Sequence, residues 1–479
     1  MKVKSFLKRS ISLLLVAFLM FTIATGCAQK DSQVKESQTN EKEQTGGKAE
    51  SSTAEQAEDE KVALTVWGTP SGTLPGQNPG EWIEKDLVQA WNAIHPNISV
   101  SVELIPFDGI NEKMTTAISS GKTPDVLIDY PGRILAYANM GAVAELDDMI
   151  PTDKMEKIRN NPDIMKMVSV NGKIVTMPYP TGAVMLVVNK TLWEEAGAAH
   201  LLPQDEYRTW TPDEFKAALK AVANKDKGVY GITLFALNEQ GDQLYNNILA
   251  GFGVRLFNDD YSRYIAAENP AAEEAFAFFK SIVDEGLCHP HPETLSAVNA
   301  LDYFKQRKTG MIVGSLAHLE IVRNGLEDGS IEGPFEAILV NYPSVNKGQA
   351  ALKSEIGQGC VFKSDDPKRV EWGKKFLYWM YAESELPYTA GSGFDIWGNE
   401  KAWIADSPHK EEAKFLTKVL GKASEWSIID PGWGIVGYPE MRAAMFPEMQ
   451  SLFIGRTSPK ETLNNISQKF NEIIEKYKQ

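Results

Sequence analysis

The chain is 479 residues long and carries 64 acidic against 49 basic side chains, a formal net charge of −15 at pH 7. This balance excludes the usual kind of nucleic-acid-binding protein, because such a protein needs a basic surface to meet the phosphates. The length exceeds what one hydrophobic core normally holds, so we expect two lobes.

Residues 1–26 have the features of a signal peptide. The basic start MKVKSFLKRS precedes the apolar run ISLLLVAFLMFTIA and a small-residue exit. The run is shorter than the ~20 apolar residues that span a bilayer, so a transmembrane helix is not expected. Thr25-Gly26-Cys27 resembles the lipobox of bacterial lipoproteins, in which the cysteine is lipidated. This resemblance implies that Cys27 anchors the chain to the outer face of the bacterial cell membrane.

Residues 27–60 predict a disordered tether. Between Ala28 and Glu60 there is no aromatic residue, and Val34 is the only large aliphatic one. Such a segment buries too little apolar surface to offset the entropy that ordering would cost. We therefore expect the folded part of the chain to begin near residue 61.

From residue 61 onward the hydrophobic pattern switches between strand and helix. KVALTVW and ISVSVELI alternate apolar and polar residues, and DVLIDY is a short apolar run. Residues 81–95 and 110–121 have helical spacing, and a further helix begins near Arg133. The order βαβαβα predicts an α/β fold in which helices cover both faces of a sheet.

A second α/β region is predicted from about residue 184, with segments such as VMLVVNK, DEFKAALKAV and GMIVGS. Ligands of open α/β sheets bind beyond the carboxyl ends of the strands, so the residues that follow strands are the binding candidates. We expect Cys288 and Cys360 to be buried thiols, while a disulfide between them stays an open alternative.

Several motifs, in their order along the chain, resemble the carbohydrate-binding branch of the extracellular solute-binding proteins of ATP-driven importers, which includes maltose-binding protein. They are TPDVLIDYPGRILAYANMGAVAEL, MPYPTGAVMLVVNKTLWEEAG, TWTPDEFKAAL, AGFGVRLF and YFKQRKTGMIVGSLAHL. The resemblance implies a periplasmic-binding-protein-like fold of type II, with two α/β lobes joined by hinge strands and a ligand cleft between them. Lobe 1 would comprise residues 61–180 and about 349–425, and lobe 2 residues 181–348 and about 426–479.

The same resemblance implies a function. The chain would be an extracellular lipoprotein that captures an oligosaccharide and delivers it to the membrane permease of an ATP-driven importer. We expect a monomer that binds no cofactor or metal at its site and is not an enzyme. The closed state would be favoured because the sugar contacts both lobes at once.

A sugar site needs aromatic rings for the C–H faces and planar polar groups for the hydroxyls. The resemblance places the family's sugar-binding arginine on Arg133 and its last aromatic on Tyr438, with Arg442 four residues later. Gly132 and Leu316 stand where the family has other contacts, so a maltodextrin site is not expected intact. The candidate ligand contacts are Trp67, Thr69, Asp129, Tyr130, Arg133, Tyr179, Gln240, Asp242, Ser315, His318, Asp395, Trp397, Trp433 and Tyr438.

The stretch PGWGIVGYPEMR, residues 431–442, also fits the G-x-G-x-x-G pattern of dinucleotide-binding loops. That fingerprint needs a βαβ unit around it, and the chain ends too soon to supply one. Pro439 would also interrupt the start of the required helix. We therefore predict a loop that presents Trp433 and Tyr438 to the cleft. The CHPHPE stretch from Cys288 is read as a proline-rich loop rather than a metal site.

Two other functions stay open. A secreted glycosidase would need two carboxyl groups beside the scissile bond, and the sequence cannot exclude such a pair. A binding protein for a peptide, polyol or glycerol phosphate is the second alternative. A phosphate ligand would call for a basic cleft, and Arg133 is the only basic residue among the candidates.

Overall fold

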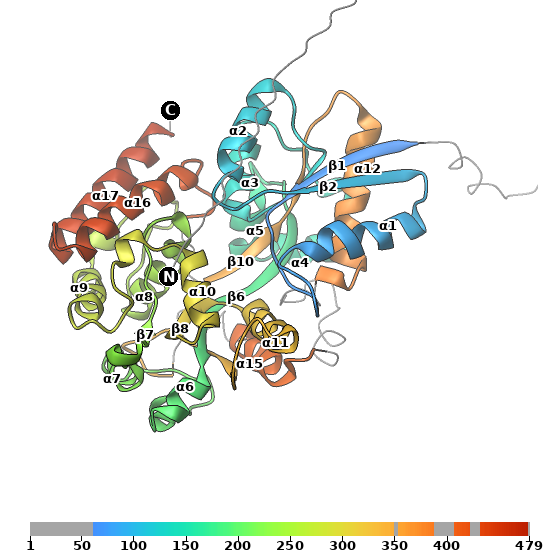
Figure 1. Cartoon of the computed structure of the whole chain (residues 1–479). Coiled ribbons are helices and arrows are strands. Elements are labelled where there is room, and N and C mark those ends of the chain that lie inside the picture. The colour runs from blue at the N-terminus through green and yellow to red at the C-terminus, as the bar shows by residue number, and fades with distance from the viewer. Residues whose placement is uncertain (1–60, 349–352, 388–406, 422–431, 478–479) are drawn as a thin grey trace, which may run out of the picture. The chain divides into compact units, whose positions relative to one another are not determined.

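The computed structural model describes residues 61–348, 353–387, 407–421 and 432–477 (Figure 1). They belong to one compact unit, residues 57–479. They contain two larger sheets with surrounding helices, and we call the region around each sheet the first and the second lobe. The predicted signal peptide, the tether, Cys27, Asp395 and Trp397 lie outside the described residues.

The first lobe is built on a four-stranded sheet with the strand order β11-β3-β1-β2. β1 pairs in parallel with both β2 and β3, whereas β11 is antiparallel to β3. Along β1, buried residues alternate with more exposed ones, as the apolar–polar alternation of its sequence predicts. The strands are β1 (Val62–Gly68), β2 (Ile98–Leu104), β3 (Val126–Ile128) and β11 (Cys360–Val361).

Helices of the first lobe follow the predicted alternation. The helix predicted at residues 81–95 is present, with a π-helical turn at Ile83–Leu87 before α1. α3 is buried from Pro131 to Tyr137 because it lies between α16, α5 and β10. The helices are α1 (Val88–Ile94), α2 (Ile110–Ser120), α3 (Pro131–Asn139), α4 (Thr152–Arg159), α5 (Pro162–Val168) and α12 (Pro367–Tyr378), and a small hairpin joins β4 (Ser169–Val170) to β5 (Lys173–Ile174).

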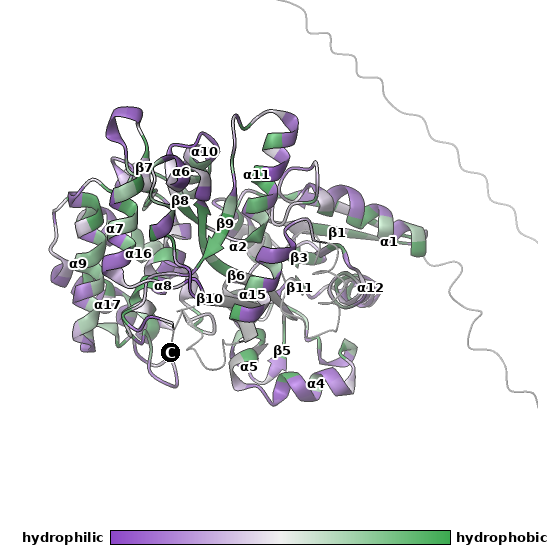
Figure 2. Ribbon diagram, turned by 90° about the horizontal axis from the view of Figure 1, so that it is seen from below, coloured by the Kyte–Doolittle hydropathy of each residue, from purple (hydrophilic) through white to green (hydrophobic). Residues whose placement is uncertain are grey.

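The second lobe contains a mixed five-stranded sheet of order β10-β6-β8-β7, in which β9 also pairs with β6. The long strand β6 is antiparallel to β8 and β9, and β7 is parallel to β8. Figure 2 shows β6 and β9 coloured as hydrophobic, whereas α4 of the first lobe is mainly hydrophilic. The strands are β6 (Met177–Asn189), β7 (Tyr230–Ile232), β8 (Thr309–Gly314), β9 (Ala337–Val340) and β10 (Lys353–Gln358).

Amphipathic helices cover the second sheet. α7 begins with Thr211, whose side chain accepts from the Glu214 N–H in a capping box, as the sequence TPDE favours. The helices are α6 (Lys190–Glu195), α7 (Pro212–Val222), α8 (Asp242–Gly251), α9 (Pro270–Asp284), α10 (Ala297–Lys305), α11 (Leu316–Asp328), α15 (Lys410–Gly421), α16 (Tyr438–Phe453) and α17 (Pro459–Lys476).

Two strands connect the lobes. β6 pairs with β10 from Met177 to Val184, and with β8 and β9 beyond that point. β10 leads through Gly359 into β11 of the first sheet. The β6–β10 register is irregular, and Gly357 and Gly359 have φ of +121° and +71°, which L side chains rarely adopt. The predicted lobe boundaries at residues 180/181 and about 348/349 fall within β6 and just before β10, and they stay predictions.

The two-lobe α/β fold predicted from the sequence is confirmed, and some details differ. α15 contacts β6 and β9 of the second lobe, whereas residues up to about 425 were expected in the first. Its Glu412 accepts from Arg208, which explains the placement. Cys288 and Cys360 are buried free thiols. Within the described ranges, no helix is both long and apolar enough to cross a membrane.

Candidate functional site

The loop after β3 carries a buried arginine–aspartate pair. Asp129 follows β3 directly, and Arg133 lies four residues later in the first turn of α3. The Arg133 Nε and Nη2 atoms donate to the two Asp129 carboxylate oxygens at 2.8 and 2.9 Å. This is the bidentate geometry in which a planar guanidinium bonds most strongly to a carboxylate.

The second lobe carries a matching pair. Asp242 begins α8, where the helix dipole favours a negative charge, and Arg442 lies on α16. The Arg442 Nε and Nη2 atoms donate to the Asp242 carboxylate oxygens at 2.8 and 2.9 Å. The Tyr438 hydroxyl, one helical turn before Arg442, donates to the same carboxylate at 3.2 Å.

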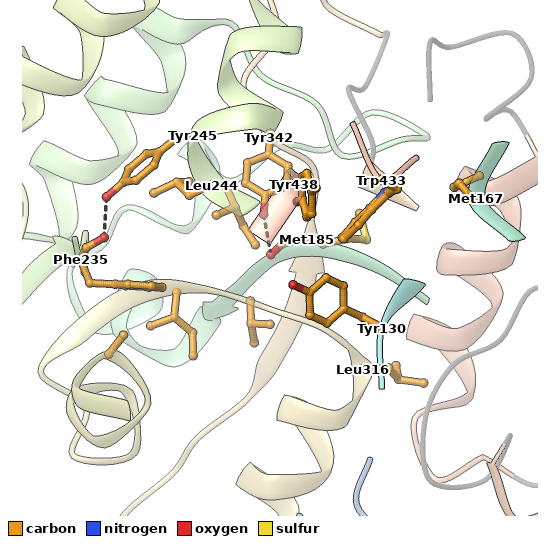
Figure 3. Close-up of a cluster of buried hydrophobic side chains, with 14 of the residues drawn as sticks. Tyr130, Met167, Met185, Phe235, Leu244, Tyr245, Leu316, Tyr342, Trp433 and Tyr438 are labelled. Atoms are coloured by element: carbon orange, nitrogen blue, oxygen red, sulfur yellow. Dashed lines mark hydrogen bonds between the residues drawn. The ribbon is translucent and has the colours of Figure 1, made fainter. Parts of the chain in front are cut away.

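The two pairs meet through Tyr130. Arg442 Nη1 donates to the Tyr130 hydroxyl at 3.0 Å, and the Tyr130 ring lies 5.4 Å from the Trp433 ring. Trp433 in turn lies 4.9 Å from Tyr438. Figure 3 shows these three rings converging near Met185 of β6. We call this group the seam, and it consists of Asp129, Tyr130, Arg133, Asp242, Trp433, Tyr438 and Arg442.

A glycine allows the rings to come together. A Cβ atom on Gly132 would lie 2.6 Å from the Trp433 ring and 2.7 Å from those of Tyr130 and Tyr438. Real Cβ contacts are essentially never that short. Gly132 stands where the resemblance predicts a ligand-binding aspartate, and here its lack of a side chain lets α3 meet the C-terminal segment.

The seam is polar yet electrically balanced, since each guanidinium faces one carboxylate. Burial lowers the pKa of the Arg442 guanidinium, because it disfavours the charged form. The negative charge of Asp242 has the opposite effect, and on balance the pKa is raised well above its ordinary value. Both arginines also lie against Phe107, with Cζ 4.2 Å from the ring for Arg133 and 5.7 Å for Arg442. Arg133 Nη1 is buried and has no hydrogen-bond partner among the described residues.

Two further contacts join the lobes. Asn238, in the loop after β7, donates to Asp108, in the loop after β2, at 3.3 Å. Asn324 on α11 accepts from the Gly76 N–H, in the loop after β1, at 3.0 Å. The loops after β1, β2 and β3 therefore all reach the second lobe, and they follow the carboxyl ends of three parallel strands. This is the edge at which an open α/β sheet binds ligands.

Other candidate residues lie outside the seam. Trp67 is half-buried beneath the ammonium group of Lys113, at 4.2 Å from its ring. The Thr69 N–H donates to a first-sheet carbonyl, and Tyr179 packs on Tyr381 with ring centroids 4.7 Å apart. Gln240 accepts from the side chain of Asn238 at 3.4 Å.

Ser315 and His318 form the capping box of α11, in which the Ser315 N–H donates to His318 Nδ1 at 3.1 Å. Both residues were predicted as ligand contacts. In the structure they stabilise the start of a helix, and burial lowers the pKa of His318 to about 4. The imidazole is therefore neutral at pH 7.

Phe107 and Arg442 contact the candidate residues but are not among the contacts predicted from the sequence. Arg442 was detectable, because it follows Tyr438 by one helical turn and so shares its face of α16. Phe107 carried no signal of its own in the loop after β2.

The rings differ from the prediction in one respect. Tyr130, Trp433 and Tyr438 were expected to offer open faces to a ligand, but they are 6%, 1% and 2% exposed and contact one another. They come from both lobes, so moving the lobes together buries them. In this arrangement the three rings offer no open face to a ligand.

The loop Gly432–Gly437 leads into α16, which places Trp433 and Tyr438 in the seam. Pro439 does not interrupt that helix, because it occupies the first turn, where its missing N–H is tolerated. In the CHPHPE stretch, the His289 ring stacks on Tyr303 at 3.7 Å. No cluster of three or more His, Cys, Asp or Glu residues is placed to hold a metal ion in the described part of the chain.

A cavity of about 450 Å³ lies elsewhere in the first lobe. Asp125, which precedes β3, and Arg369 of α12 line it and form an ion pair at 2.6 Å. It lies at the amino end of β3, opposite the end that leads to Tyr130, and is therefore separate from the seam.

Comparison with known proteins agrees with this architecture. A diacetylchitobiose binding protein, DasA of Streptomyces coelicolor (strain ATCC BAA-471 / A3(2) / M145), is 27% identical over 260 residues, which cover 52% of this chain and 54% of that protein. A binding protein of Brucella abortus (strain 2308) is 23% identical over 396 residues, 82% of this chain and 90% of that protein. The structure of an ABC substrate-binding protein of Listeria monocytogenes in complex with cycloalternan aligns with a TM-score of 0.68 and 19% identity, over 86% of this chain and 99% of that one. The model of the family described as bacterial extracellular solute-binding protein matches residues 75–385, more than half of the chain. The chain therefore belongs to the bacterial extracellular solute-binding proteins.

Proposed function

We propose that the chain is a receptor for a neutral oligosaccharide, which it binds between its lobes and delivers to the permease of an ATP-driven importer. It acts as a monomer held on the outer face of the cell membrane by acylated Cys27. The candidate ligand contacts predicted from the sequence, including Asp395 and Trp397, remain part of this proposal.

The observation that carries the proposal is the charge balance of the seam. Arg133 and Arg442 each bond to one carboxylate through two N–H groups, so neither offers a net positive charge to a ligand. A phosphate or carboxylate ligand would require such a charge. Arg133 Nη1 nevertheless remains as a buried donor without a partner among the described residues, and a sugar hydroxyl would supply its acceptor.

The rings of the seam suit the rest of a sugar. Tyr130 belongs to the first lobe, whereas Trp433 and Tyr438 belong to the segment that packs on the second. A pyranose that entered with the rings moved apart would meet aromatic faces from both lobes, and its contacts with both would hold the lobes together around it. Two relatives bind saccharides according to their names, diacetylchitobiose in one and cycloalternan in the other, which supports this ligand class.

The geometry disfavours the glycosidase alternative. Asp129 and Asp242 are the carboxylates of the seam, and each accepts two N–H groups from an arginine. A glycosidase needs one carboxyl group that is protonated and free to give its proton to the leaving group. In the seam a guanidinium occupies both oxygens of each carboxylate, so neither carboxyl group is free to face a leaving group.

Calorimetric titration of the purified chain tests the proposal. The panel contains diacetylchitobiose, cellobiose, maltotriose and cycloalternan, with glucose 6-phosphate and a tripeptide as charged and peptide alternatives. We expect at least one neutral saccharide to bind and to be recovered intact. Binding of only the phosphate or the peptide, or recovery of cleaved sugar, would contradict the proposal.

The variant Tyr438→Ala should weaken saccharide affinity on the order of tenfold, because it removes an aromatic face and a bond to Asp242. Tyr264→Ala is the matched control, since Tyr264 is equally buried in the second lobe but packs on Phe257 and Phe470. Equal affinity losses in the two variants would show that Tyr438 acts only through stability.

A further inference from the structure

Residues 69–80, which follow β1, form a folded loop that we call the strap. The Gly80 N–H donates to the Gly72 carbonyl at 2.8 Å and closes the loop on itself. Trp82 Nε1 donates to the Ser71 carbonyl at 2.8 Å, which ties the strap to the first lobe. Thr73 is only 2% exposed, although Ser71 and Gly76 are exposed. The strap thus has a fixed inner side and a solvent side.

The tip of the strap bonds to one side chain of the second lobe, that of Asn324 on α11. Asn324 Oδ1 accepts from the Gly76 N–H at 3.0 Å. Asn324 Nδ2 donates to the carbonyls of Leu74 and Gln77 at 3.2 and 3.4 Å. In Figure 1 the blue segment after β1 runs toward α11. Three hydrogen bonds between the lobes therefore depend on a single amide.

Neighbouring charges hold that amide in place. Arg323 Nη2 donates to Asn324 Oδ1 at 3.0 Å, and Arg323 Nε bonds to both carboxylate oxygens of Glu320 at 3.1 and 3.0 Å. His409 Nε2 lies 2.9 Å from Glu320 Oε2. With these bonds the Asn324 side chain uses two acceptor and two donor positions, which is its full capacity. Its orientation is fixed by a network on its own lobe as well as by the strap.

The strap is the third of three loops that bridge the lobes. The others connect Asp108 with Asn238 and Tyr130 with Arg442. The strap bonds to Asn324 through its own backbone, and such contacts do not depend on a particular side chain of the loop. The strap bridge is more exposed than the buried Arg442 bond.

We propose that the strap closes over the bound ligand and that Asn324 is the positioning residue that holds it shut, so that Asn324 sets how long the ligand stays bound. This inference rests on the proposed function, because it assigns the strap to the same site. Hinge proteins gain affinity from contacts made only in the closed state. Asn324 should therefore affect the dissociation rate of the ligand rather than its association rate.

Hydrogen–deuterium exchange at single-residue resolution tests the strap directly. The Gly76 amide bonds to Asn324, whereas the Gly80 amide bonds within the strap and serves as an internal control. In the full chain, Asn324→Ala should speed exchange of the Gly76 amide on the order of tenfold and leave the Gly80 amide unchanged. Asn324→Asp keeps the acceptor of the Gly76 amide and loses both donors, so we expect a smaller increase than in Asn324→Ala.

Stopped-flow measurements with the panel saccharides provide the second readout. Asn324→Ala should raise the dissociation rate on the order of tenfold and leave the association rate and the melting temperature unchanged. Asn346→Ala, at an exposed asparagine of the second lobe, should change neither rate.

The two proposals fail separately. If no panel saccharide binds, the proposed function is wrong. Amide exchange in the unliganded chain still tests whether Asn324 holds the strap against the second lobe. Equal exchange of the Gly76 amide in the wild type and in Asn324→Ala, with and without saccharide, would contradict the proposal that Asn324 holds the strap shut. A lower association rate with an unchanged dissociation rate also overturns it.

Discussion

Arg442 and Asp242 are 3% and 2% exposed, and their bidentate contact lies among aromatic rings. Removing two charges from water is costly, and their attraction offsets that cost only when both partners are present. The pair thus fixes where α16 meets α8, because a different alignment would leave a buried charge alone.

Breaking this pair should be far worse than replacing it. We expect Arg442→Met to lower the free energy of unfolding by about 3 to 5 kcal/mol, since Asp242 stays buried without its partner. The double variant Arg442→Met/Asp242→Leu should recover more than half of that loss. Urea denaturation monitored by tryptophan fluorescence measures both. Additive losses in the double variant would argue against an isolated buried pair.

Sequence could predict one of the two pairs better than the other. Asp129 and Arg133 are four residues apart at the start of a helix, and a strand end followed by a helix is a readable pattern. Asp242 and Arg442 are separated by 200 residues, so only the fold brings them together. The same holds for the contact of Arg442 with Tyr130 across 312 residues. The closure of the rings on one another also could not be predicted, because it depends on Gly132 having no side chain.

Among the elements, α11 shows that two candidate ligand contacts also have a structural role. Ser315 and His318 follow a strand of the second sheet, where ligand contacts are expected, yet they cap the helix. His318 Nδ1 accepts the Ser315 N–H, so that nitrogen must be unprotonated. Burial lowers the pKa of His318 to about 4 from its ordinary 6.5.

A pH dependence of stability follows from this cap. The folded pKa lies below the unfolded one, so the contribution of His318 is complete above pH 6.5 and is lost as pH falls toward 4, by up to about 1.4 kcal/mol per pH unit. His318→Gln keeps the acceptor of a capping box and removes the titration. We expect the variant to lose less stability than the wild type between pH 7 and pH 5 in urea denaturation. Identical losses would contradict the assignment.

Strands and helices were predictable where the hydrophobic period was clear, as in β1, β2 and α7. Pro439 was misread because a proline in the first turn starts a helix as readily as it breaks one further along. The contact of α15 with β6 and β9 could not be predicted, because an amphipathic pattern indicates a buried face but not the element that covers it. The strap had only turn residues to identify it, and its bond to Asn324 spans 248 residues.

At the scale of the whole molecule, α3 connects the two lobes. It follows β3 of the first sheet and packs against α16, which in turn lies on α17 and α9 of the second lobe. Gly132 permits that approach, since its missing side chain leaves room for Trp433 and Tyr438. The closeness of the lobes here thus depends on one backbone position.

Adding a single methyl group at this position should hold the lobes apart. In Gly132→Ala the new Cβ would lie 2.6 to 2.7 Å from three rings, which cannot move aside within a buried cluster. We expect a larger radius of gyration than in the wild type by small-angle X-ray scattering. Gly109→Ala is the control, because its nearest contact would be 4.0 Å away. An unchanged radius with only a lower melting temperature would show that the rings rearrange locally.

The position of β11 also determines when the first sheet can be completed. β11 (residues 360–361) pairs with β3 (residues 126–128). That edge of β3 therefore stays unpaired until more than two hundred further residues have been synthesised. Until then the nascent chain has an apolar strand with an open edge, and such an edge pairs readily with other chains. Delayed pairing of this kind slows folding, because a large loop must close first. Completion of the first sheet is therefore a late step of folding, which needs more than two hundred residues beyond β3 to be present.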